Sequence, residues 1–199
     1  MLGAVLVDLG RFEEGDSVYR KSLRSYDNIS PFPLAWVSFQ LGMLWGELAD
    51  VPHPNRAARW YRRSIAYLPN YVRARVHLAE IFAAQGRLSD AEALLRPALA
   101  SGDPEVAWRL ADILTAEDRF EEAAPHLDGA RATFETLLAK YPLAFADHAA
   151  EFYAGSGDDM PRALELARIN VANRPTRRAL AQLRAIEESA SAPIPGEDQ

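Results

Sequence analysis

The side chains best able to carry acid–base or metal chemistry at neutral pH are the histidines, and the chain has four of them, His53, His77, His126 and His148. Their positions do not follow the spacing of a metal site. His77 and Glu80 share one face of a predicted helix, but a metal site there needs at least one more ligand pair. Asp147 and His148 are adjacent, so on a helix their side chains point about 100° apart and cannot form an orienting pair by themselves.

Other catalytic patterns are missing from the sequence. It contains no cysteine, which excludes disulfides, thiolate catalysis and Cys-based zinc sites. It has no Gly-rich phosphate loop, HExxH or GxSxG motif. The loop from Gly155 to Asp159 fits a turn between two helices, with Asp159 as the N-cap of the second. We therefore predict a protein that is not an enzyme, with no catalytic residue, metal or cofactor.

The charge and hydropathy patterns narrow the class of partner. The formal net charge of the 199-residue chain is −6, which argues against nucleic acid as the partner, because binding phosphates requires a basic surface. No apolar stretch reaches about 18 residues, so no membrane insertion is expected. The apolar start lacks a basic leader and is broken by Asp8, which argues against a signal peptide. We expect a soluble cytoplasmic protein with a flexible tail at residues 190–199.

Helix periodicity recurs along the chain in a repeated unit. The clearest unit runs from Val72 to about Asp103, with apolar residues at steps of three and four. Gly86 interrupts it, and the run of residues 89–92 (Ser-Asp-Ala-Glu) reads as a capping box that starts a second helix. From Pro69 to Asp103 is 34 residues, and from Pro142 to Pro175 is 33. Such spacings are typical of a helix-turn-helix repeat of 34 residues.

These motifs resemble the tetratricopeptide repeat family over nearly the whole chain. The resemblance implies an all-α, right-handed α-solenoid of about five helical hairpins plus a C-terminal capping helix. The expected repeats cover residues 1–30, 34–70, 71–103, 104–142 and 143–175, and the closing helix covers 176–189 with Thr176 as its cap. Small residues are expected where paired helices cross, among them Gly42, Ala79, Ala57 and Ala91.

Several positions depart from the family pattern. The first repeat lacks the beginning of its first helix. The second helix of the fourth repeat, from about Glu121 to Lys140, is about ten residues longer than the 34-residue pattern allows. Its extra turns could contact a partner or pack against the array. Pro97 lies inside a predicted helix and should disrupt it, because it lacks an N–H donor and crowds the preceding turn.

In this family the first helix of each pair lines a concave face, so the resemblance implies a set of groove residues. They are Trp36, Phe39, Met43, Arg73, Glu80, Trp108, Asp112, His148 and Phe152. Aromatic anchors mixed with a few charges are typical of a binding hot spot. The alternative is that the tryptophans are ordinary core between repeats. Some family members clamp C-terminal carboxylates with Lys, Asn and Arg, but the matching places here hold Val76, Glu80 and Trp108, which argues against that ligand.

Arginines concentrate between residues 56 and 75, and Arg56, Arg59 and Arg63 share one helix face. That face could dock an acidic partner, or it could simply be solvated. The function we predict is a non-catalytic scaffold or adaptor that binds a protein or peptide segment in its groove. Two alternatives remain: a regulatory repeat region of a larger enzyme or secretion complex, and a self-assembly module that forms a homodimer.

Overall fold

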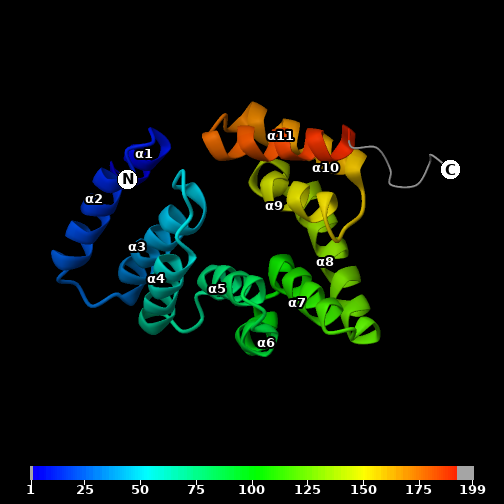
Figure 1. The fold of residues 1–199 in the computed structure, drawn as a ribbon, viewed down its shortest axis with the longest axis horizontal. Coiled ribbons are helices and arrows are strands. Elements are labelled where there is room, and N and C mark those ends of the chain that lie inside the picture. The colour runs from blue at the N-terminus through cyan, green and yellow to red at the C-terminus, as the bar shows by residue number, and fades with distance from the viewer. Residues whose placement is uncertain (1, 192–199) are drawn as a thin grey trace. The chain divides into compact units, whose positions relative to one another are not determined.

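The computed structural model describes residues 2–191, and every regular element in that range is helical (Figure 1). Eleven α-helices and two short helices of other types occur among these residues. The predicted all-α fold is therefore confirmed. The chain divides into two compact units, residues 1–123 and 124–199. Most of the predicted tail at 190–199 lies outside the described residues.

The first unit consists of consecutive helices that pack as pairs in chain order. Its elements are α1 (Leu2–Asp8), α2 (Phe12–Arg24), α3 (Pro31–Met43), η1 (Leu44–Leu48), α4 (Pro54–Tyr67), α5 (Val72–Ala84), α6 (Leu88–Leu95), η2 (Arg96–Ser101) and α7 (Pro104–Ala116). The pairs are α1 with α2, α3 with α4, and α5 with α6, and each following helix packs on the pair before it. A single helix pair cannot bury its apolar face alone, so this stacking builds the core.

The close approach of α3 and α4 depends on Gly42. A Cβ atom at this position would lie 2.2 Å from Cε1 of Tyr61, which is far inside van der Waals contact. Tyr61 is almost fully buried, and its ring lies against Phe39 on α3. Ala57 on α4 is completely buried as well. Small side chains at this crossing therefore let the two backbones come close enough to enclose the tyrosine ring.

The boundaries of α6 differ in part from the sequence prediction. The capping box expected at residues 89–92 is wrong, because α6 already begins at Leu88 and no side chain caps it. The acid of its first turn, Asp90, instead accepts a hydrogen bond from Arg87 at 2.8 Å. The disruption expected at Pro97 is present: α6 ends at Leu95 and the chain continues as a 3-10 helix from Arg96.

The second unit contains most of α8 (Phe120–Lys140), α9 (Pro142–Ala154), α10 (Met160–Asn173) and α11 (Arg177–Ser191). Its core includes the rings of Phe134 and Phe152, whose centroids are 5.2 Å apart. Two caps predicted from sequence are confirmed. The side chain of Asp159 accepts a hydrogen bond from a backbone N–H at 3.0 Å, and Thr176 Oγ1 accepts one at 3.2 Å. α11 packs on α10 and buries Ala179 and Ile186.

Among the described residues, no helix combines the length and the apolar character needed to cross a membrane.

Candidate functional site

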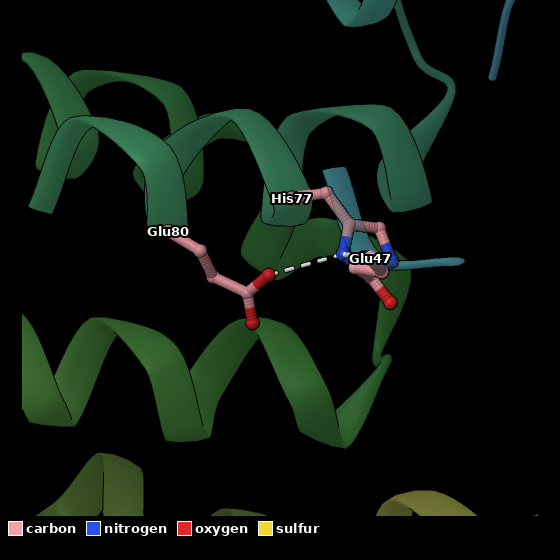
Figure 2. Close-up of side chains that lie close together, drawn as sticks. All are labelled: Glu47, His77 and Glu80. Carbon is pink, nitrogen blue, oxygen red and sulfur yellow. Dashed lines mark hydrogen bonds and ion pairs between the residues drawn. The ribbon is translucent and has the colours of Figure 1, made fainter. Parts of the chain in front are cut away.

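A polar cluster lies where η1 and α5 meet in the first unit (Figure 2). Nδ1 of His77 is 2.9 Å from Oε1 of Glu47 and 3.0 Å from Oε2 of Glu80. The imidazole is buried, and its ring stacks on Tyr61 with the centroids 5.6 Å apart. The two carboxylates are only partly buried. One ring nitrogen thus contacts two carboxylates that come from two consecutive helix pairs.

The protonation of His77 follows from these contacts. Burial by itself would lower the pKa of the imidazole, because the charged form loses its hydration. The hydrogen bonds to Glu47 and Glu80, together with their negative charges, outweigh burial and raise the pKa of His77 to about 10. The side chain is therefore an imidazolium at neutral pH. In that form it is a poor general base.

The cluster continues onto α7 through an arginine. Nε of Arg109 lies 2.6 Å from Oε1 of Glu80, while the other oxygen of that carboxylate contacts His77. Asp112, one turn further along α7, is 3.8 Å from the same guanidinium group. Acidic and basic groups therefore alternate along one face of η1, α5 and α7. These are the first-helix positions of three successive repeats.

Two cavities lie along this face and share Glu80 in their walls. The first has a volume of about 310 Å³ and is lined by Glu47, His77, Tyr61 and Ala84 among others. The second has a volume of about 280 Å³ and is lined by Arg109, Asp112, Ala83, Leu88 and Ala116 among others. Each cavity combines apolar walls with a few charged groups. This composition is typical of sites that hold a ligand side chain in a defined orientation.

Four of the residues predicted to line a groove are interior instead. Phe39, Met43, Trp108 and Phe152 have at most 8% of their surface exposed. Phe39 packs against the rings of Tyr61 and His77. The Tyr61 hydroxyl donates a hydrogen bond to Sδ of Met43 at 3.5 Å. These four side chains pack the core: Phe39, for example, contacts Tyr61 of α4 and His77 of α5, and Phe152 contacts Phe134 of α8. They present almost no surface to a partner.

The other five predicted residues keep some exposure. Glu80 and Asp112 line the cavities described above, and Arg73 is exposed on α5. Trp36 is half-buried against the core cluster around Leu41 and Trp45. His148 belongs to the second unit, on α9, where Nε2 lies 3.9 Å from the neighbouring Asp147 carboxylate.

Glu47 and Arg109 were not among the residues predicted from sequence. The repeat spacing gives no signal for Glu47. Glu80 and Asp112 occupy the same place in successive repeats, each eight residues after the start of its helix (80 − 72 = 112 − 104 = 8), whereas Glu47 lies in η1, beyond the end of α3. Arg109 lies 32 residues after His77, so a basic residue recurs in the same way (109 − 77 = 32).

The arginine-rich face of α4 is largely occupied by contacts within the first unit. Arg56 lies over the ring of Trp45, 3.4 Å from its centroid, and donates to Oδ1 of Asp16 at 2.9 Å. Arg63 donates to the hydroxyl of Tyr67 at 3.0 Å. Arg59 is exposed. These contacts give Arg56 and Arg63 a structural role at the surface of α4.

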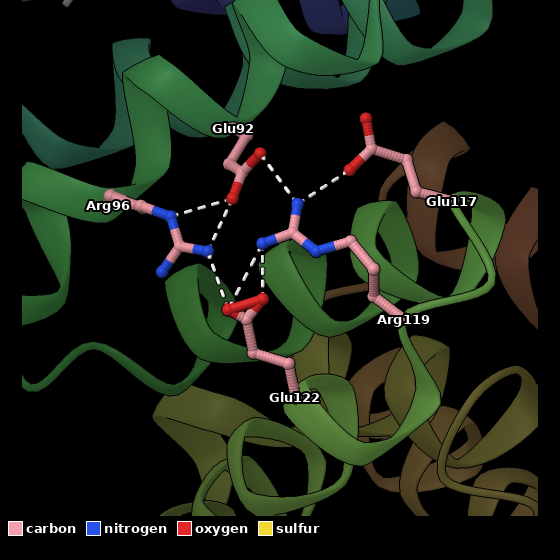
Figure 3. A network of polar contacts seen from close by, with 5 residues as sticks. All are labelled: Glu92, Arg96, Glu117, Arg119 and Glu122. Carbon is pink, nitrogen blue, oxygen red and sulfur yellow. Dashed lines mark hydrogen bonds and ion pairs between the residues drawn. The ribbon is translucent and has the colours of Figure 1, made fainter.

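A second charged network joins α6 and η2 to the turn that follows α7 (Figure 3). Arg119 donates to Glu92 at 3.0 Å and to Glu117 at 2.7 Å, and it also pairs with Glu122. Arg96 contacts Glu92 and lies 3.0 Å from Glu122. The hydrogen bond from Arg119 is the main reason why the pKa of Glu92 is lowered. The acidic and basic groups of this network neutralise one another, which favours a structural role in joining successive repeats.

Comparison with known proteins agrees with this arrangement of helices. The model of the tetratricopeptide repeat family matches residues 53–102, which include α4, α5 and α6. Residues 53–102 are thus similar to a tetratricopeptide repeat. Repeats of this family commonly serve as scaffolds for protein interactions, which is the coarse functional class that the match supports. A comparison of the sequence with curated proteins gave no significant match.

A solved structure extends the likeness in fold beyond the matched repeat. TTC0263, a thermophilic TPR protein of Thermus thermophilus, is 18% identical, and the alignment covers 95% of each chain with a TM-score of 0.54. At this identity the likeness shows the tetratricopeptide-repeat fold. MamA AMB-1 is 18% identical over 96% of this chain and 90% of its own, with a TM-score of 0.48. YrrB, described as a TPR protein with an unusual peptide-binding site, is 14% identical over 85% of this chain and 97% of its own, with a TM-score of 0.43.

Proposed function

We propose that this protein is a non-catalytic scaffold and that its first unit binds a segment of a partner protein across α5 and α7. The observation that carries the proposal is the pair of cavities of about 310 and 280 Å³ that meet at Glu80. A partner segment would place one side chain in each cavity and pass over Glu80 between them. Among the residues predicted from sequence, Glu80 and Asp112 would contact the segment directly.

The chemistry of the two cavities fits a peptide better than a small polar metabolite. Ile81 and Ala84 give the first cavity an apolar wall, and Ala83, Leu88 and Ile113 do the same for the second. Apolar walls with a few fixed charges provide affinity through burial and register through the charges. The charged groups are already held by one another, so little side-chain entropy would be lost when the segment binds.

The arrangement of the charged side chains also supports a scaffold rather than an enzyme. The reactive group of the cluster, His77, forms ion pairs with two carboxylates, and Glu80 forms a further ion pair with Arg109. Groups that neutralise one another in this way orient a ligand but are not free to transfer a proton at low energy.

Selection from a displayed random-peptide library tests the proposal for partner segments of any sequence. Ala84 lines the first cavity and Ala116 the second, and both are exposed, so Ala84→Trp and Ala116→Trp should fill the cavities without unfolding the helices. Ala93→Trp on α6 is the matched control, because Ala93 is exposed but lines neither cavity. Circular dichroism checks that all three variants fold.

We expect selected peptides to bind wild type and Ala93→Trp equally and to lose at least about tenfold in affinity for each cavity variant, which is about 1.4 kcal/mol. Peptides that bind all four proteins alike would show that the cavities are not the site. A library that yields no binder at all would count against the scaffold function itself.

A further inference from the structure

We propose that Glu47, His77 and Glu80 form a binding site for one divalent transition-metal ion, held between the second and third helix pairs (Figure 2). The proposal stands independently of peptide binding, since it rests on the positions of the side-chain atoms in the cluster. His77 Nδ1 and one carboxylate oxygen from each glutamate all lie within 4.8 Å of one another.

The spacing of these atoms matches metal coordination closely. Two ligand atoms, each bonded to an ion at about 2.1 Å, are about 3.0 Å apart at right angles and about 3.4 Å apart in the tetrahedral geometry that Zn²⁺ prefers. The observed separations from His77 Nδ1 are 2.9 Å to Glu47 and 3.0 Å to Glu80. An ion can therefore take the place now held by the Nδ1 proton with shifts of only a few tenths of an ångström. That proton leaves the cluster when the ion enters.

The ligand types select the class of ion. Imidazole nitrogen binds Zn²⁺, Fe, Ni and Cu well, whereas Mg²⁺ and Ca²⁺ prefer oxygen ligands only. Two carboxylates balance the double positive charge of the ion. The three protein ligands leave further positions open, and the adjoining cavity of about 310 Å³, lined by all three residues, has room for the water molecules that complete the coordination.

The surroundings hold the ligands in place before an ion arrives. The ring of His77 packs against Tyr61 and Phe39, with centroid distances of 5.6 and 5.5 Å. Arg109 holds the second oxygen of Glu80 at 2.6 Å, which leaves the other oxygen directed at His77. In metal sites, partners that fix the orientation of a ligand in this way raise the affinity for the ion. An ion bound here would join η1 to α5, because Glu47 and His77 come from different helix pairs.

Calorimetric titration of the full chain with ZnCl₂ alone, after removal of bound metals with a chelator, tests the site. We expect saturable binding of one Zn²⁺ per chain, a rise in melting temperature with Zn²⁺, and no effect of MgCl₂ at the same concentration. Glu47→Gln and His77→Asn should each weaken Zn²⁺ binding by more than about tenfold, since loss of a group that merely orients a ligand already weakens binding by about 10–100-fold.

Two control variants keep the test specific. Glu13→Gln changes an exposed carboxylate on α2, and His126→Asn removes a histidine of the second unit, so both should bind Zn²⁺ as wild type does. Glu47→Gln acts at a partly exposed carboxylate and should keep the fold, which circular dichroism verifies.

Absence of saturable Zn²⁺ binding would overturn the metal site, and so would equal affinity in wild type and Glu47→Gln. Peptide selection repeated in chelator separates this result from the proposed function. Two results together would support both the peptide site and the metal site: peptide binding that survives in chelator, and loss of Zn²⁺ binding in Glu47→Gln. Either proposal can fail without the other.

Discussion

Substituting alanine for Gly42 tests the packing that brings α3 and α4 together. The new Cβ would lie 2.2 Å from Cε1, 2.4 Å from Cδ1 and 2.8 Å from Cζ of Tyr61. The ring is 1% exposed and is held by Phe39 and His77, so it has little space to move away. Overpacking of this kind destabilises a protein by about 1–3 kcal/mol.

The magnitude must include the helix propensity of the new residue. Alanine is favoured over glycine inside a helix by about 1 kcal/mol. Because the overlap is severe, we take the upper end of the overpacking range, which leaves a net destabilisation of about 2 kcal/mol. With a urea m value of about 2 kcal/mol/M, the unfolding midpoint of Gly42→Ala should fall by about 1 M.

A double-mutant cycle isolates the contact from other effects of the substitution. Tyr61→Val removes all three ring atoms that the Cβ would meet. In that background Gly42→Ala should become stabilising by about 1 kcal/mol, so the coupling energy between the two sites is about 3 kcal/mol. Gly129 on α8 is the matched control, because a Cβ there would meet nothing within 4 Å. Gly129→Ala should raise the stability by up to about 1 kcal/mol.

Urea unfolding followed by circular dichroism measures all of these variants. Should Gly42→Ala change the midpoint by the same amount whether residue 61 is tyrosine or valine, the steric argument is refuted. An unchanged or raised midpoint in the wild-type background would refute it as well.

Two further predictions concern a helix cap and the charged network. Asp103→Ala should lower the free energy of unfolding by about 1 kcal/mol, because the Asp103 carboxylate accepts a hydrogen bond from the backbone at the start of α7 at 3.0 Å. Ser30→Ala, at the same place before α3, should change the stability little, because the Ser30 side chain makes no such bond. Urea unfolding compares the two variants. The pKa values of Glu92 and Glu122 are lowered in the folded protein, mainly by hydrogen bonds from Arg119 and Arg96 respectively. Each carboxylate therefore stabilises the fold at pH values above its pKa in the unfolded chain, and this stabilisation is lost as the pH falls through its lower pKa in the folded protein. The urea midpoint of wild type should therefore decrease more between pH 7 and pH 3 than that of a Glu92→Gln, Glu122→Gln variant, and parallel decreases would contradict this.

Much of the fold could be predicted from sequence because each repeat follows local rules. Helix periodicity, the glycine at position 86 with its positive φ of 73°, and the caps Asp159 and Thr176 all act within a few residues. The close fit of Gly42 was also predictable, since paired helices can approach closely only through small residues. The boundary of α6 was less predictable, because Glu92, the acid of the expected capping box, pairs with Arg96 and Arg119 instead.

The candidate site was harder to predict, for a reason visible in α3. Seven of its 13 residues are buried, from Ala35 to Met43, so the helix is apolar around most of its circumference. Periodicity then cannot tell the side that faces the partner helix from the side that stays open, which is why Phe39 and Met43 were assigned to a groove and lie in the core. Glu47 was missed because it follows α3 in a turn of π-helix, which shifts the side-chain positions.

The position of Tyr61 bears on how the first unit comes apart. The Tyr61 ring packs against Gly42 of its own helix pair and also stacks on His77 of the next pair. Opening the second pair would expose His77 and break its contact with Glu47, and opening the third would uncover Tyr61. The two neighbouring repeats should therefore exchange their slowest amide hydrogens at a common rate, as one cooperative segment, rather than fraying one after the other.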